Sequence, residues 1–158
     1  MKLLTGYIAA IALALAGGSA AAAEFCVTTS TELKQALMTA GSNGEADTIK
    51  IETGTYASTG GSAAFAYTTS ENSSLSLQGG WVSNPPALCV RQVQLPAATI
   101  LSGSDARQVL KLSGAAGTSG GQSISNLTLR DGLSSQPGAG LSFGGGGGFL
   151  GNIVLTRV

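Results

Sequence analysis

Acidic side chains are spread thinly along this chain, and their spacing decides whether catalysis by paired carboxylates is expected. Hydrolysis of a glycosidic bond needs two carboxylates at a controlled separation, one acting as acid and the other as base or nucleophile. The eight acidic residues are Glu24, Glu32, Glu45, Asp47, Glu52, Glu71, Asp105 and Asp131. No two aspartates are close in sequence, so neighbouring residues predict neither a catalytic pair nor a calcium-binding cluster.

Two further segments could carry chemistry. Arg130 and Asp131 could project from a strand end towards a neighbour such as Arg157, but Asp-Gly after a strand is a common reversal, and we favour an ordinary turn. The glycine run 144–148 lacks the following Lys-Ser or Lys-Thr of a phosphate-binding loop and predicts a flexible bend. We therefore expect no catalytic residue, no cofactor and no metal ion.

The aromatic residues Trp81 and Tyr56 offer a possible contact for sugars. Aromatic faces suit carbohydrate and peptide surfaces, so these two residues could form a stacking platform. A lone tryptophan at a turn more often packs over a cap or a disulfide. We favour this packing role for Trp81.

Two cysteines and an N-terminal apolar segment indicate export. Lys2, the apolar run 8–16 and the small residues 21–23 form a tripartite signal peptide over residues 1–23, with Glu24 as the mature start. The run is short for a membrane anchor, which needs about 20 apolar residues, so we expect no stable membrane span after cleavage. In an exported chain, Cys26 and Cys89 predict a disulfide, with two buried free thiols as the alternative.

Charge excludes some partners. The chain has eight basic and eight acidic residues and no histidine. Nucleic acids and anionic membranes attract clustered lysine and arginine, so we expect no nucleic-acid partner. Carbohydrate or protein at the cell surface fits this neutral composition better.

One helix is predicted near the start of the mature chain. Thr29 and Glu32 have capping-box spacing, and apolar residues follow at helical intervals until Gly41. The pattern predicts a helix over about 30–40 whose apolar stripe consists of Leu33, Ala36, Leu37 and Ala40. We interpret it as a cap over the open end of a β-structure, rather than as a partner-binding helix.

A short alternating phrase recurs through the remaining chain and predicts strands. Its first apolar residues lie at 49, 75, 100, 127 and 153, with intervals of 26, 25, 27 and 26. Such a period indicates a solenoid of stacked coils, from residue 47 onward, with about 26 residues per coil. Additional strands are predicted at 25–27, 64–67, 109–112 and 141–143.

The repeat predicts which side chains stack. We expect a ladder in which Leu129 lies over Leu155 and Asn126 over Asn152. The full set of ladder residues is Ile49, Ile51, Leu75, Leu77, Ile100, Asn126, Leu127, Leu129, Asn152, Ile153 and Leu155. With no helices between strands, the fold class is an all-β parallel β-helix with one N-terminal capping helix.

Three stretches carry a family resemblance: 26–56, Leu77-Gln78-Gly79-Gly80-Trp81, and 125–132. Together they resemble the N-terminal portion of a right-handed parallel β-helix of the pectin-lyase-like superfamily. The similar branch contains exported bacterial surface proteins with polymorphic-outer-membrane-type repeats. This resemblance implies the fold and an exported location (periplasm, outer surface or extracellular), but no activity, because the superfamily mixes lyases, hydrolases, adhesins and passenger domains.

The sequence-level hypothesis is an exported, non-enzymatic structural or adhesion module. Val158 directly follows a strand phrase, so we expect a chain truncated at its C-terminus that self-associates through an uncapped last coil. One alternative is the N-terminal part of a polysaccharide lyase or hydrolase whose active coils are missing. Another is a non-functional truncated product.

Overall fold

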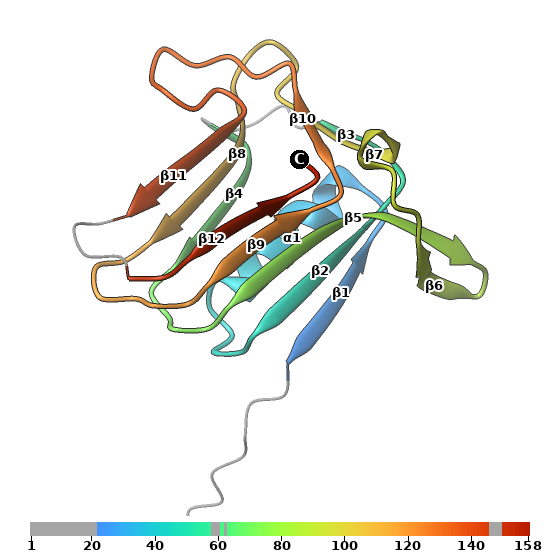
Figure 1. Cartoon of the computed structure of the whole chain (residues 1–158), viewed down its shortest axis with the longest axis horizontal. Helices are drawn as coiled ribbons and strands as arrows, with labels where there is room; N and C mark the ends of the chain where they lie inside the picture. The colour runs from blue at the N-terminus through green and yellow to red at the C-terminus, as the bar shows by residue number, and fades with distance from the viewer. Residues whose placement is uncertain (1–21, 58–60, 62, 146–149) are drawn as a thin grey trace, which may run out of the picture.

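A computed structural model describes residues 22–57, 61, 63–145 and 150–158, and shows three parallel sheets with one helix (Figure 1). Sheet A has the order β1-β2-β5-β9-β12, with β6 paired to β5. Sheet B has the order β10-β7-β3, and sheet C has the order β11-β8-β4. The helical segments are α1 (Ser30–Ala40) and the short 3-10 helix η1 (Pro96–Ala98). The strands are β1 (Ala23–Val27), β2 (Asp47–Glu52), β3 (Gly54–Ala57), β4 (Ala63–Thr69), β5 (Leu75–Asn84), β6 (Ala87–Gln92), β7 (Thr99–Ser102), β8 (Gln108–Gly114), β9 (Gln122–Ser125), β10 (Thr128–Arg130), β11 (Leu141–Gly145) and β12 (Ile153–Thr156).

From β2 onward the chain visits sheets A, B and C in turn, and only β6 interrupts this order. Each strand pairs in parallel with strands from other circuits. The exception among the described pairs is the antiparallel hairpin of β5 and β6. The inward faces of the three sheets enclose a shared core that includes Ile49, Phe65, Leu77 and Leu110.

The predicted helix is confirmed, together with its capping box. Thr29 accepts a hydrogen bond from the Glu32 backbone, and the Glu32 carboxylate accepts one from the Thr29 backbone. Leu33, Ala36, Leu37 and Ala40 are buried, and α1 contacts β4, β1 and β2. The helix is 11 residues long, and no described helix is both long and apolar enough to cross a bilayer.

The predicted fold class, an all-β right-handed parallel β-helix with about 26 residues per coil, is wrong. The evidence against a constant coil is the register of the paired strands in sheet A. Ile49 pairs with Leu77, Leu75 pairs with Gln122, and Gln122 pairs with Ile153, so the separations between paired residues are unequal. The chain is instead a small domain of three short parallel sheets and one helix. Its successive circuits through the sheets differ in length.

The recurring phrases belong to two different sheets, which is why their equal spacing misled. The phrases at 49, 75 and 153 lie in sheet A, whereas the phrase at 100 forms β7 of sheet B. Leu129 of the phrase at 127 pairs with Leu101 in sheet B, and Leu155 pairs with Ile124 in sheet A. The predicted stack of Leu129 over Leu155 is therefore wrong.

The ladder prediction also fails at the asparagines and at the last strand. The Asn152 carbonyl accepts a hydrogen bond from the Gln122 backbone, and Asn126 instead lies beside Thr156. Ile153 and Leu155 lie on the core side of sheet A as partners of Gln122 and Ile124, but they are 37% and 50% exposed instead of buried. By contrast Ile49, Ile51, Leu75, Leu77 and Leu127 are buried as core residues, while Leu129 is partly buried against them.

Two predictions fall wholly or partly outside the described residues. The signal peptide at 1–23 lies almost entirely there, since the structure describes the chain from residue 22. The glycine bend at 144–148 is described only at Gly144 and Gly145, which end β11.

Candidate functional site

Sheet A presents a continuous face of short polar side chains on the side away from the core. Thr48, Ser76 and Ser123 are register partners on β2, β5 and β9 and form one row. Two residues further along the same strands, Lys50, Gln78 and Ser125 form a second row. Because neighbouring strands lie about 4.8 Å apart, each row is evenly spaced. We call these six residues the polar face.

Hydroxyl and amide groups dominate the polar face and make it adaptable in hydrogen bonding. Each serine or threonine hydroxyl donates and accepts, and the glutamine amide offers both functions. Gln78 Nε2 donates to Ser76 Oγ at 2.9 Å, which links the two rows. All six residues are half-buried.

Lys50 is the cation of the polar face, and its charge is already engaged. Its Nζ lies 2.5 Å from Glu24 Oε1 on β1 and 4.3 Å from the centre of the Trp81 ring. The ion pair balances the ammonium charge, and the lysine covers a face of the indole. The edge of the polar face therefore carries no net charge, and Trp81 packs under Lys50.

Tyr56 is unavailable for a stacking platform with Trp81, the alternative that the sequence left less favoured. Its side chain is 3% exposed, and its hydroxyl lies 3.0 Å from the Glu52 carbonyl and 3.3 Å from the Val27 carbonyl. Burial, with a smaller effect of the Glu52 and Glu32 charges, raises the pKa of Tyr56 to about 12. Tyr56 thus fastens β3 to β1 and β2, which excludes the Trp81–Tyr56 stacking platform, the less favoured alternative from the sequence.

The predicted disulfide between Cys26 and Cys89 is present and fastens β6 to β1. The Cα atoms are 5.8 Å apart, and the two residues are separated by 63 positions. The Glu52 carboxylate lies beside both sulfurs, so these three residues resemble a metal-binding cluster by distance alone. Sulfur in a disulfide carries no thiolate, which is the form that binds metals. The disulfide therefore links β6 to the edge strand β1, where Cys26 is the register partner of Lys50.

A group of acidic residues gathers where β2 begins, and sequence inspection missed it. Asp47 is 3% exposed and accepts a hydrogen bond from Asn43 Nδ2 at 2.9 Å. Burial raises the pKa of Asp47, and the Glu45 and Glu71 charges act in the same direction. Glu71 accepts a hydrogen bond from the Gly44 backbone, which closes the loop before β2. Because Glu71 follows β4, no local spacing could have predicted the group.

Arg130 and Asp131 occupy a turn, as favoured from the sequence. Asp131 has a φ of 53° and accepts a hydrogen bond from Ser102 Oγ at 3.1 Å, and Arg130 Nε lies 3.1 Å from its carboxylate. Arg157 donates to the Gln94 side chain. Arg130 and Asp131 thus pair with each other, whereas Arg157 binds Gln94, so the three residues considered for catalysis do not form one cluster.

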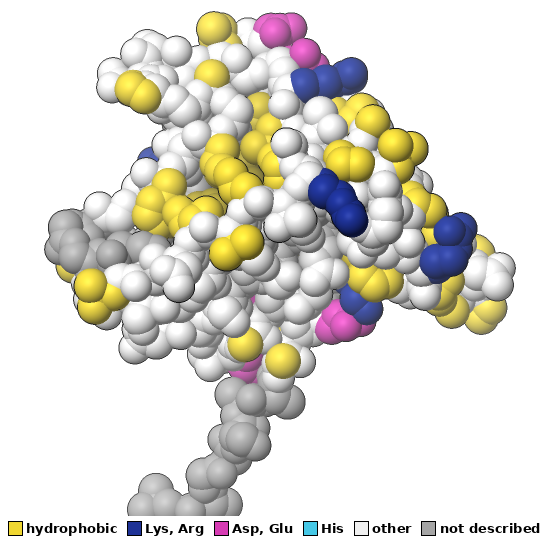
Figure 2. Space-filling model, in the orientation of Figure 1, with side chains coloured by type: hydrophobic (Ala, Val, Ile, Leu, Met, Phe, Trp, Pro, Cys, Tyr) yellow, Lys and Arg dark blue, Asp and Glu magenta, His cyan; other side chains and the backbone are white. Residues whose placement is uncertain are grey.

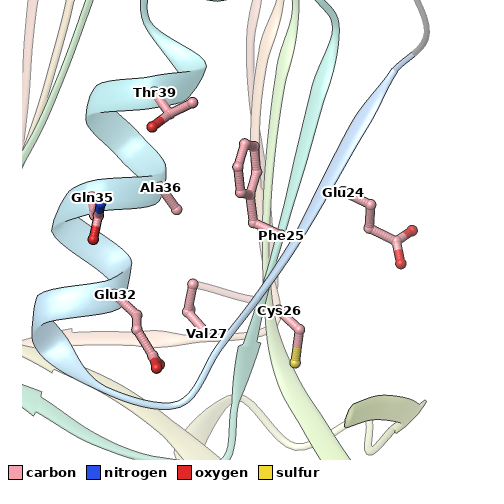
Figure 3. Close-up of a pocket in the computed structure, with 8 residues that line it drawn as sticks. All are labelled: Glu24, Phe25, Cys26, Val27, Glu32, Gln35, Ala36 and Thr39. Atoms are coloured by element: carbon pink, nitrogen blue, oxygen red, sulfur yellow. The ribbon is translucent and has the colours of Figure 1, made fainter. Parts of the chain in front are cut away.

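A groove of about 400 Å³ separates β1 from α1 (Figure 3). Phe25 and Val27 point from β1 towards the helix, whereas Glu24 and Cys26 point away (Figure 3). Ala36 lines the helix side, and Gln35 and Thr39 are exposed on the same helix. Since β1 is the edge strand of sheet A, its outer backbone edge has no strand partner in the described part of the chain.

Comparisons with protein-family models, with curated proteins and with solved structures found no match for this chain. The resemblance to pectin-lyase-like proteins therefore stays an untested prediction.

Proposed function

We propose that this chain is an exported, non-enzymatic adhesion module that binds neutral polysaccharide on its polar face. The observation that carries the proposal is the registered pair of rows, which places hydroxyl and amide groups at strand spacing over three adjacent strands. A polysaccharide chain presents repeated hydroxyls that both donate and accept. Such a ligand matches a surface whose own groups do the same.

Electrostatics favour a neutral ligand over a charged one. The only cation of the polar face is Lys50, which is paired with Glu24, and the whole chain has no net charge. An anionic polymer would have to compete with Glu24 for this lysine. A neutral polymer leaves the pair intact and avoids the cost of desolvating an unpaired charge.

Export agrees with the disulfide and with the N-terminal pattern. Disulfides persist in oxidising compartments, and the Cys26–Cys89 bridge indicates a non-reducing environment. The pattern over residues 1–23 predicts secretion. A module that acts at a surface would meet polysaccharide outside the cytosol, so location and ligand are consistent.

The test is a binding screen with substitutions on the polar face. The secreted product of the full chain is titrated by calorimetry against neutral and acidic polysaccharides, and reducing ends and unsaturated products are assayed in parallel. Ser76→Arg with Ser123→Arg should weaken binding of a neutral polysaccharide at least tenfold, because two long cations cover two of the three strands of one row. Ser135→Arg, in the exposed segment between β10 and β11, is the matched control.

Two results would contradict the proposal. Unchanged affinity in the double variant would place the ligand elsewhere. Release of new reducing ends or unsaturated sugars would show that the chain cleaves the polymer, as the polysaccharide lyase or hydrolase alternative requires.

A further inference from the structure

Among the described residues, the two edge strands of sheet A are β1 on one side and β12 on the other. Each carries apolar side chains on the face that continues the core. On β1 these are Phe25 and Val27, the register partners of the buried Ile49 and Ile51. On β12 they are Ile153 and Leu155, partners of Gln122 and Ile124. Ile153 is 37% and Leu155 50% exposed, so this edge displays side chains of a core type to solvent.

We propose that a second copy of this chain docks head to tail, with β12 of one copy inserted in the groove between β1 and α1 of the next. All pairs along β1-β2-β5-β9-β12 are parallel, so parallel addition of β12 to β1 continues sheet A from copy to copy. Strand addition of this kind satisfies the backbone groups of both edges.

Side-chain pattern supports this pairing. When Ile153 is aligned with Phe25, Leu155 falls beside Val27, and both aliphatic side chains point to the helix side of the groove, where Phe25 and Val27 also point. The groove of about 400 Å³ provides room for these side chains next to Ala36. The apolar residues of β12 and β1 therefore fall at matching positions when the two strands are paired.

Charge supports the same register. Parallel alignment places Arg157 of the entering copy beside Thr29 of the receiving copy. There the Glu32 carboxylate accepts hydrogen bonds from the Thr28 and Thr29 backbones at 2.8 and 3.0 Å. These bonds hold the pKa of Glu32 below its ordinary value, so the carboxylate is charged at neutral pH. Arg157, which donates to Gln94 within its own copy, thus exchanges this partner for a fixed anion just beyond the shared strand.

The remaining edges extend the contact. The end strands of sheets B and C, β10 and β11, also have no second strand partner in the described chain. Hydrophobic side chains gather between β11 and β12 on the face shown in Figure 2. Exposed apolar residues near these strands include Leu133 at 57% and Leu150 at 72%. Because the two contact surfaces differ, the interface is heterologous and joins copies into open chains or rings.

The experiment uses two complementary variants of the full chain, each purified as the secreted, disulfide-bonded product. Leu155→Lys places a charge on the exposed β12. Gln35→Lys with Thr39→Lys places charges on exposed helix positions beside the groove. Ser135→Lys serves as the control. Sedimentation velocity over a concentration series gives the masses, and circular dichroism verifies the fold of every variant.

The unmodified chain and the control should form species whose mean mass grows with concentration. Each variant alone should associate at least tenfold more weakly. An equimolar mixture of the two should form dimers that grow no further, since the mixture contains one intact β12 and one intact groove per pair.

Two outcomes overturn the proposal. A monomeric unmodified chain at every concentration excludes self-docking. Dimers of the groove variant alone would show that β12 pairs with β12, an isologous contact. Polysaccharide binding on the polar face should be unchanged in both variants, so failure of this proposal is distinguishable from failure of the proposed function.

Discussion

Asn126 shows how a single side chain holds two segments of this chain in place. It is 2% exposed with a φ of 56°, and its Nδ2 donates to the carbonyls of Gly79 at 2.9 Å and Val93 at 2.6 Å. Asparagine tolerates this left-handed conformation better than most residues. Sequence analysis gave Asn126 a ladder role with Asn152. Its actual partners lie on either side of the β5–β6 hairpin, too far along the chain for a repeat to reveal.

Substitution of Asn126 should separate its two contributions. Asn126→Ala should lower the free energy of unfolding by about 3 kcal/mol, because two buried carbonyls lose their donor and alanine resists a positive φ. Asn126→Gly keeps the backbone relaxed and should cost about 1 kcal/mol less than alanine. Urea unfolding measures both. Equal stability of the alanine variant and the parent would contradict the assigned role.

Tyr56 should make stability depend on alkaline pH. The unfolded chain ionises tyrosine near 10, whereas Tyr56 ionises at about 12 in the folded chain. Between these values the folded state binds more protons, so its stability is complete below pH 10 and is lost as pH rises towards 12. Tyr56→Phe should flatten this loss. The measurement is the free energy of unfolding, obtained by rapid denaturant mixing at pH 8 to 11. If this free energy falls with pH equally steeply in the variant and the parent, the role of Tyr56 is contradicted.

At the scale of elements, local patterns identified the pieces well. The capping box located α1, and alternating apolar residues located strands such as β2, β4, β8 and β11. The same alternation could not assign strands to sheets, because it reports that one face is buried without naming the neighbouring strand. Equal spacing of phrases therefore suggested a single ladder, whereas strands from two sheets contributed to it.

The Cys26–Cys89 bridge should contribute strongly to the placement of β6. It closes a loop with a separation of 63 positions, for which the chain-entropy model gives about 4 kcal/mol. Replacement of both cysteines by serine should lower the free energy of unfolding by about this amount while leaving the circular dichroism of the folded state similar. Urea unfolding provides the measurement. A difference below about 1 kcal/mol would show that the bridge constrains little beyond what the sheet already fixes.

At the scale of the whole molecule, three parallel sheets and one helix create two distinct surfaces. The polar face lies on the outside of sheet A, and the edges of β1 and β12 flank the same sheet. The low, balanced charge predicted no nucleic-acid partner and allowed carbohydrate or protein at the cell surface, while the N-terminal pattern and the cysteine pair predicted export. Composition could not locate the polar face or the groove, since both depend on pairing between strands that are distant in sequence.

Polysaccharide binding on the polar face can be mapped residue by residue. The disulfide-bonded protein, labelled with nitrogen-15, is titrated by nuclear magnetic resonance with the neutral polysaccharide that binds best in the screen, shortened to soluble oligosaccharides. The account predicts that the largest shifts fall at Thr48, Ser76, Gln78, Ser123 and Ser125. Shifts confined to the groove or to the loops between β10 and β11 would contradict it, as would none at all with saturating ligand.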